Sequence, residues 1–124
     1  MKIEYREPIE EFNRDLKKLL KKFITLEEDL STVKINAIEL YHLKKIDNES
    51  IFAIEHFCSE EIKVYKVKKF ACKCLKGRGV KSGIRIIYAY YPKDNSVQFI
   101  EMYFKGVKEN EDKERIKEYL KSAT

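Results

Sequence analysis

The sequence has no long apolar run. No stretch approaches the roughly 18 consecutive apolar residues that a membrane-spanning helix needs. The first residues, MKIEYREPIEEF, also lack the apolar centre of a signal peptide. We therefore expect a cytoplasmic protein with no membrane partner.

Cysteine and histidine are scarce. The three cysteines are an odd number in a chain without an export signal, which argues against a disulfide framework and favours reduced thiols. His56 with Cys58, and Cys72 with Cys74, share an i, i+2 spacing, so a zinc site could be imagined if two strands were neighbours. Zinc knuckles normally have longer spacers, and buried cysteine is common, so core thiols are the preferred interpretation. We expect no metal and no cofactor.

Familiar catalytic patterns are missing as well. His42 stands alone on a predicted helix, where a surface or core role is the simpler interpretation. Nothing resembles a nucleophile–histidine–acid triad or a nucleotide-binding glycine loop. Nor is there an internal repeat or a low-complexity segment. These absences leave the charged residues as the main indication of function.

Positive charge is concentrated in the middle of the chain. The net charge is +5, but residues 63–108 hold 12 Lys/Arg against 2 Asp/Glu, an excess of +10. The flanking segments, residues 1–62 and 109–124, carry −4 and −1. Such a distribution is the electrostatic footprint of a phosphate-binding face, although a basic surface that only confers solubility is the alternative.

The first half of the chain predicts two helices. After a short strand near residues 2–5, Pro8 suits a first helical turn, and a helix is expected to about Phe23. Thr25 and Glu28 have the spacing of a capping box at the start of a second helix, which extends to about Tyr41. Since the connection is short, we expect a helical hairpin that covers a sheet.

The second half predicts strands and a final helix. Strands are expected over residues 51–57, 64–75, 84–91 and 97–105, with a bulge where the alternation slips near Lys68. The last two should form an antiparallel hairpin through PKDNS. Residues 110–122 should form a terminal helix. The 124 residues and 44% hydrophobic content favour one domain, 1–124, of the α+β class. In it an N-terminal helical hairpin packs on one face of a small antiparallel sheet.

Two stretches resemble a known family. LKGRGVKSGIRIIYAYY and VQFIEMYFKGVKENED resemble the RelE/ParE superfamily of toxins from toxin–antitoxin modules. The resemblance covers roughly residues 64–108 and implies a RelE/ParE-like fold. It also implies messenger RNA cleavage at the ribosome, by attack of a ribose 2′-hydroxyl on the adjacent phosphate without a metal, and a cognate antitoxin as partner.

The resemblance implies a set of site residues. Arg85 matches the family's strand arginine, which contacts the scissile phosphate, and the four implied catalytic residues are Lys76, Arg78, Arg85 and Lys105. An insertion in the glycine-rich loop would bring Lys73 or Lys81 into the site instead. The implied RNA-binding residues are Lys73, Lys81, Tyr88, Tyr103 and Lys108. For each lysine an ordinary surface cation is the alternative.

One departure favours a different function. Relatives that cleave messenger RNA often have a tyrosine or histidine just beyond the last strand, whereas GVKENEDKERI, residues 106–116, has neither. The alternatives are a ParE-like inhibitor of DNA gyrase, or an RNA-binding relative that has lost catalysis. Tyr119 follows in the terminal helix, but its spacing does not show that it reaches the loop.

Overall fold

The computed structural model describes residues 2–74 and 82–123. Its strands form one five-stranded sheet in the order β1-β5-β4-β3-β2. Their bounds are β1 (Glu4–Tyr5), β2 (Ile51–Ala53), β3 (Lys63–Val67), β4 (Ile84–Tyr91) and β5 (Ser96–Phe104). The α-helices are α1 (Glu10–Leu20), α2 (Leu26–Val33), α3 (Leu40–Leu43) and α4 (Lys113–Ala123). The prediction of an α+β fold is confirmed.

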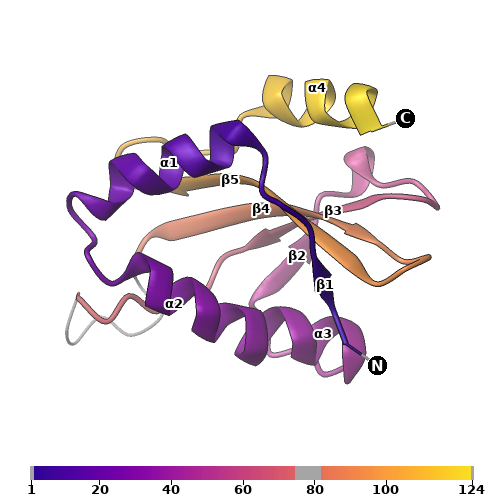
Figure 1. The fold of residues 1–124 in the computed structure, drawn as a ribbon, viewed down its shortest axis with the longest axis horizontal. Helices are drawn as coiled ribbons and strands as arrows, with labels where there is room; N and C mark the ends of the chain where they lie inside the picture. Colours follow the sequence, from indigo (N-terminus) through magenta and orange to yellow (C-terminus); the bar gives the residue numbers. More distant parts are fainter. Residues whose placement is uncertain (1, 75–81, 124) are drawn as a thin grey trace.

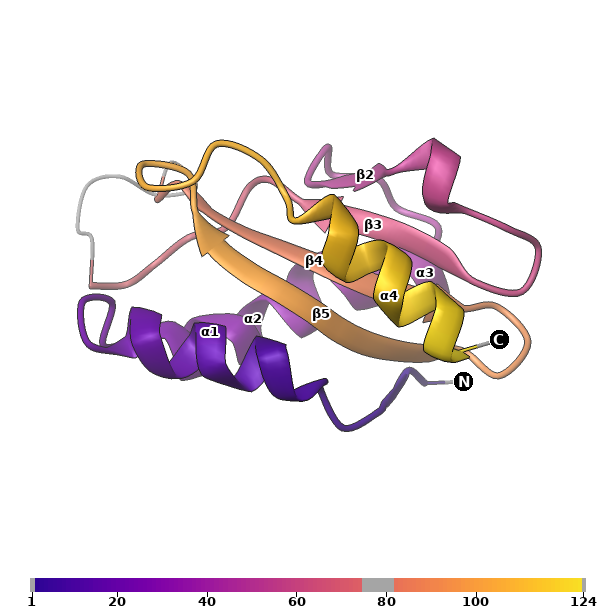
Figure 2. The same ribbon diagram turned by 90° about the horizontal axis from the view of Figure 1, so that it is seen from above.

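The helices lie on both faces of the sheet, and not on one face as expected (Figures 1 and 2). Alternation along β4 creates the two faces, because successive side chains of a strand point to opposite sides. Ile84, Ile86 and Tyr88 join the core beneath the N-terminal helices, whereas Ile87 and Ala89 pack with α4. The described residues therefore form two apolar clusters, one on each face of the sheet.

The N-terminal helices share one sheet face without forming a close hairpin. Helix α1 packs chiefly on β5, where the rings of Phe12 and Phe99 stack with centroids 5.2 Å apart. Helix α2 continues through a π-helical segment, Lys34–Glu39, into α3. The expected capping box does not form, because the Thr25 hydroxyl donates to Asp29 and leaves the first turn of α2 without a side-chain cap.

The basic strand after residue 62 is shorter than predicted. Strand β3 ends at Val67, so the slip in alternation near Lys68 marks the point where the chain leaves the sheet, and the bulge predicted there is wrong. The irregularity lies instead between β4 and β5, where the register shifts between Ile87 and Tyr88. The β4–β5 hairpin itself is confirmed.

Strand β1 makes the sheet mixed, because it pairs in parallel with β5 while all other neighbours are antiparallel. Beyond β1, the outer edge of β5 is covered by groups from α1, its preceding loop and α4. The backbone N–H of Arg6 donates to the Val97 carbonyl, and that of Ile9 donates to the Phe99 carbonyl. The Asp15 carboxylate accepts the Met102 N–H. The Arg115 guanidinium donates to the Ile100 carbonyl.

Within the described ranges, no helix has the length and apolar character needed to cross a bilayer.

Candidate nucleic-acid interface

A basic pocket lies on the α4 side of the sheet, where β4 begins and β5 ends. It is a cavity of about 150 Å³ lined by Lys66, Lys68, Arg85, Tyr103, Lys105, Glu109 and Asn110. Arg85 pairs directly with Tyr103 across the two strands. Side chains of directly paired residues lie side by side on one face, so the strands themselves fix this part of the pocket.

The pocket remains open because α4 covers the other end of the strands (Figure 2). Tyr119 of α4 shares a 2.5 Å hydrogen bond with the hydroxyl of Tyr91, the last residue of β4, and donates to Gln98 over 2.6 Å. Arg85 is the second residue of the same strand. Tyr119 therefore holds α4 to the far end of the sheet and does not approach the pocket.

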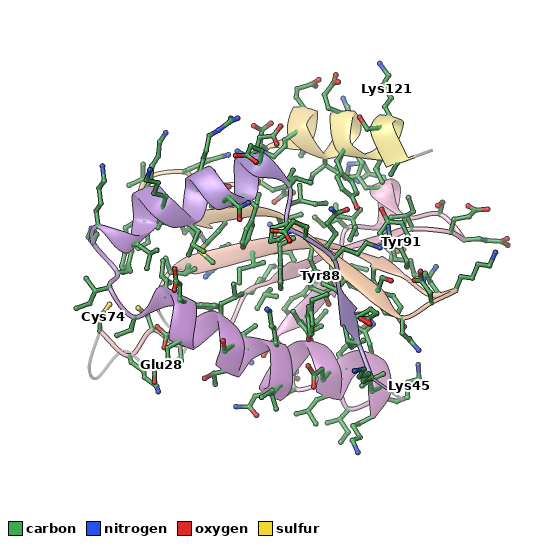
Figure 3. The ribbon with its side chains drawn as sticks, in the orientation of Figure 1. Glu28, Lys45, Cys74, Tyr88, Tyr91 and Lys121 are labelled. Atoms are coloured by element: carbon green, nitrogen blue, oxygen red, sulfur yellow. The ribbon has the colours of Figure 1, made fainter. Side chains whose placement is uncertain are left out.

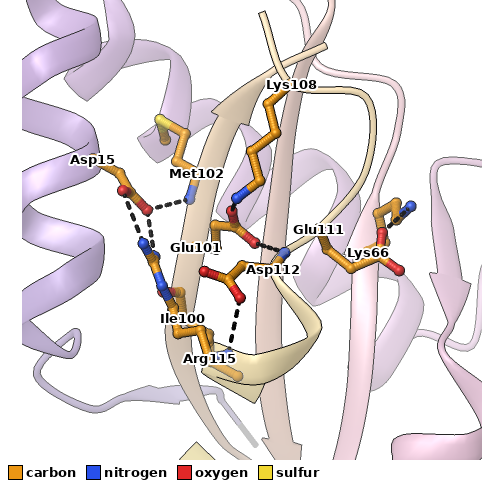
Figure 4. Close-up of polar contacts among 9 residues, drawn as sticks. All are labelled: Asp15, Lys66, Ile100, Glu101, Met102, Lys108, Glu111, Asp112 and Arg115. Carbon is orange, nitrogen blue, oxygen red and sulfur yellow. Dashed lines mark hydrogen bonds and ion pairs between the residues drawn. The ribbon is translucent and has the colours of Figure 1, made fainter. Parts of the chain in front are cut away.

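Two lysines near the pocket are already paired with carboxylates (Figure 4). Lys66 lies 2.5 Å from Glu111, and both side chains are largely buried. Lys108, expected to bind RNA, forms an ion pair with the buried Glu101. Both carboxylates offset positive charge, so Lys66 and Lys108 have structural roles that the sequence did not indicate.

The other three cations that line the pocket, Arg85, Lys68 and Lys105, have no carboxylate partner within residues 2–74 and 82–123. Arg85 is half-buried and donates only to its neighbouring carbonyl, that of Ile84, over 3.2 Å. Lys105 is exposed, and its backbone N–H donates to the Gly83 carbonyl over 2.8 Å. Lys68 is exposed and lies 4.6 Å from the centre of the Phe52 ring. These three side chains are available to an anionic ligand.

Tyr103 lines the buried side of the pocket. Its side chain is buried, so its ring is not free to stack on a base as expected. Burial raises the pKa of the Tyr103 hydroxyl, while Lys66, within hydrogen-bonding reach, opposes that rise. The protonated hydroxyl and the lysine therefore form a polar floor beside Arg85.

Tyr88 lies elsewhere, in the core between the sheet and α3 (Figure 3). Its side chain is fully buried, and its hydroxyl is 2.8 Å from Nε2 of His42. Tyr88 was expected to contact RNA, but it lies on the opposite face of β4 from the pocket, together with Ile86 and Tyr90. His42 is correspondingly a satisfied core residue, stacked on Tyr90 with ring centres 3.9 Å apart.

Lys73 lies apart from the pocket, against the start of α2. Its Nζ is 2.5 Å from a Glu28 carboxylate oxygen, and its backbone N–H donates to Asp29. The expected site residues Lys76, Arg78 and Lys81 lie outside the described residues. Of the expected residues, the structure thus brings together Arg85, Tyr103 and Lys105.

Sequence reasoning missed Lys66 and Lys68, which also line the pocket. For Lys66 the available signal was its place in β3 between the buried Tyr65 and Val67, whereas Lys68 follows the end of that strand. The acidic run after β5 was interpreted only as a helix start. That interpretation holds for Asp112, whose carboxylate accepts the Arg115 N–H over 3.0 Å, but Glu111 instead neutralises Lys66.

The imagined zinc ligands do not come together. The Cys58 thiol lies within hydrogen-bonding distance of the carbonyls of Ile54 and Val64, while Cys72 and Cys74 contact each other near α2. In the part of the chain that the structure describes, no group of three or more His, Cys, Asp and Glu side chains could hold a metal ion.

The fold is similar to that of a chain in the crystal structure of the archaeal RelE–RelB complex from Pyrococcus horikoshii OT3. The match has a TM-score of 0.50 and 12% sequence identity, and covers 86% of this chain and 98% of the other. No protein-family model matches the sequence, and no curated protein shows significant similarity to it. At such low identity the similarity establishes the fold alone, which is RelE-like.

Proposed function

We propose that this protein is the toxin of a toxin–antitoxin module and acts as an endoribonuclease on messenger RNA at the ribosome. One observation carries the proposal: on a RelE-like fold, Arg85, Lys68 and Lys105 converge on one pocket without carboxylate partners among the described residues. Phosphate is the ligand that such a group of cations suits best. The basic central segment of the sequence supports the same choice.

The proposed reaction is attack of a ribose 2′-hydroxyl on the adjacent phosphorus. A bond forms from the 2′-oxygen to phosphorus as the bond to the 5′-oxygen breaks, so negative charge develops on the phosphoryl oxygens and on the leaving oxygen. Arg85, held by its strand, stabilises the first of these charges, and Lys105 provides a second cation beside it. Lys76 and Arg78 are proposed to assist the proton transfers.

The test is induction of the protein in a bacterial host, with mapping of new RNA 5′ ends. We expect growth arrest and new ends within translated codons. Arg85→Ala should remove both while the purified protein stays folded. Lys93→Ala is the matched control, because Lys93 is an exposed cation in the turn at the opposite end of β4. Full toxicity of a folded Arg85→Ala variant would reject the proposed site.

Inhibition of DNA gyrase is the second candidate. It is favoured by the absence of tyrosine and histidine from residues 106–116, and by the Glu109 carboxylate that lines the basic pocket. Growth arrest with trapped gyrase–DNA cleavage complexes and without new RNA ends would support it. Normal growth would point to an RNA-binding relative without catalysis.

An antitoxin is the proposed partner. The similar archaeal structure is of a RelE–RelB complex, and a cationic pocket of this kind suits an acidic protein segment that competes with RNA. Co-expression with the product of an adjacent gene, if it is the antitoxin, should restore growth and yield a complex on purification. Loss of that complex at high salt would indicate charge pairing.

A further inference from the structure

Cys72 and Cys74 hold their sulfur atoms close together beside the start of α2. The two Sγ atoms are 3.0 Å apart, and both residues follow β3 on the segment that leaves the sheet. A disulfide requires a sulfur–sulfur distance of about 2.05 Å. The sulfurs therefore need to approach by only about 1 Å to reach bonding distance.

Hydrogen bonds hold the backbone of Lys73 and Cys74 against α2. The acceptors are the side chains of Asp29, in α2, and of Thr25, the residue just before this helix. The Cys74 N–H donates to the Thr25 hydroxyl over 3.0 Å, and the Lys73 N–H donates to the Asp29 carboxylate over 3.1 Å. Asp29 is only 2% exposed, and the Thr25 hydroxyl donates to it over 2.7 Å. Figure 3 shows Cys74 and Glu28 at this same end of α2. These bonds keep the dithiol in place before any reaction.

The two thiols differ in access and acidity. Cys72 is 3% exposed, and burial raises the pKa of its thiol to about 11. Cys74 is half-buried; burial raises the pKa of its thiol, but hydrogen bonds with Cys72 and Thr25 outweigh that effect and hold it below the ordinary value. Oxidants react with the thiolate, so Cys74 is the first of the pair to be oxidised.

We propose that Cys72 and Cys74 are a modification site at which peroxide oxidation forms a reversible intramolecular disulfide. The Cys74 thiolate attacks hydrogen peroxide, the O–O bond breaks, one oxygen leaves as water and the other stays on sulfur as a sulfenic acid. The Cys72 sulfur then attacks the Cys74 sulfur, an S–S bond forms, and the second oxygen leaves as water. The two thiols lose two electrons and two protons in total, and the peroxide is reduced to two waters.

Cys58 provides an internal control in the same chain. The carbonyls of Ile54 and Val64 both lie within reach of its single S–H donor, and its sulfur accepts the Val64 N–H over 3.4 Å, so its contacts are with backbone groups. No other thiol contacts it within residues 2–74 and 82–123. We expect it to remain a free thiol while the pair reacts.

The test is alkylation mapping of the full-length protein after treatment with hydrogen peroxide. The reduced protein, once unfolded, should be alkylated at all three cysteines. The oxidised protein should be alkylated at Cys58 alone, with an intact mass lower by two hydrogens before alkylation, and a dithiol reductant should restore the original pattern. Peptide mapping should place the crosslink between Cys72 and Cys74.

Three variants keep the result interpretable. Cys72→Ser should leave a sulfenic acid on Cys74 that dimedone captures, and Cys58→Ser should form the disulfide as the unmodified protein does. Thr25→Val removes a hydrogen bond that positions Cys74 and should slow formation of the disulfide. Accumulation of sulfinic acid on Cys74 with Cys72 still alkylated would overturn the proposal, as would a disulfide that requires Cys58 or joins two molecules. None of these readouts depends on the proposed ribonuclease activity.

Discussion

Nε2 of His42 and the hydroxyl of Tyr88 share a 2.8 Å hydrogen bond inside the main core. His42 is 6% exposed and lies among the rings of Tyr41, Tyr65 and Tyr90. Burial, and to a lesser degree the positive charge of Lys45, lowers the pKa of His42 from 6.5 to about 4. The folded protein therefore keeps this imidazole neutral at pH values at which an exposed histidine is charged.

The burial of this imidazole makes stability sensitive to acid. Between pH 6.5 and 4 the unfolded chain binds a proton at His42 that the folded chain does not, so the free energy of unfolding should fall as pH decreases. The expected loss from this group is at most about 3 kcal/mol. Urea unfolding at a series of pH values measures it. His42→Gln should flatten the profile.

Lys105 should contribute to RNA affinity through its charge alone. A single-stranded 2′-O-methyl RNA lacks the attacking hydroxyl and so reports binding without cleavage. Lys105→Ala should weaken this binding and reduce the slope of log affinity against log salt by about 0.7, the contribution of one phosphate contact on a single strand. Fluorescence anisotropy across a salt series measures both. An equal change in Lys93→Ala would indicate nonspecific attraction.

Glu101 should stabilise the start of α4. This carboxylate, 1% exposed, accepts hydrogen bonds from the Lys108 ammonium and from the Asp112 N–H (Figure 4). Glu101→Gln keeps the shape but removes the charge, and should lower the free energy of unfolding by about 1–3 kcal/mol.

Chemical denaturation measures this effect against a surface control. Glu114→Gln breaks only an exposed pair with Lys117 on α4 and should change stability by less than about 0.5 kcal/mol. Similar values for the two variants would contradict a special role for the buried carboxylate.

Gly83 should resist substitution because of its backbone conformation. Its φ angle is +84°, and an added Cβ would lie 3.0 Å from the Phe104 ring. Gly83→Ala should destabilise the protein by about 1–2 kcal/mol, the cost of a left-handed conformation for an ordinary residue. Gly83→Asn should cost less, because asparagine tolerates this region better. Equal losses in thermal unfolding would assign the cost to the ring contact instead.

The local patterns in the sequence predicted the elements better than their arrangement. Alternation identified the β4–β5 hairpin, and apolar spacing identified helices on either side of it, because both signals are local. The position of α4 on the opposite face depends on which side of β4 packs with Ile116 and Tyr119. These contacts join residues far apart in the sequence, so no local pattern encodes them. β1 also pairs with a strand about 90 residues away, and the parallel direction of that pairing leaves no mark in a two-residue strand.

The candidate site was predictable in part for the same reason. Arg85 stood out as a cation within an apolar strand, and the hairpin carries it to Tyr103. The pairing of Lys108 with Glu101 was not predictable, since it depends on how the loop after β5 folds back. The side of β4 on which Tyr88 lies was not predictable, because apart from Arg85 the residues on both faces of this strand are apolar or aromatic, so composition does not show which side each tyrosine occupies.

The covered edge of β5 restricts how this sheet can grow. An open edge strand is a template on which a strand of another chain can pair, either in a specific complex or in aggregation. Along β5 that template is occupied by the backbone of β1 and the following loop, the Asp15 carboxylate and the Arg115 guanidinium. Within the described sheet, a partner that binds by strand addition is therefore directed to the opposite margin, along β2.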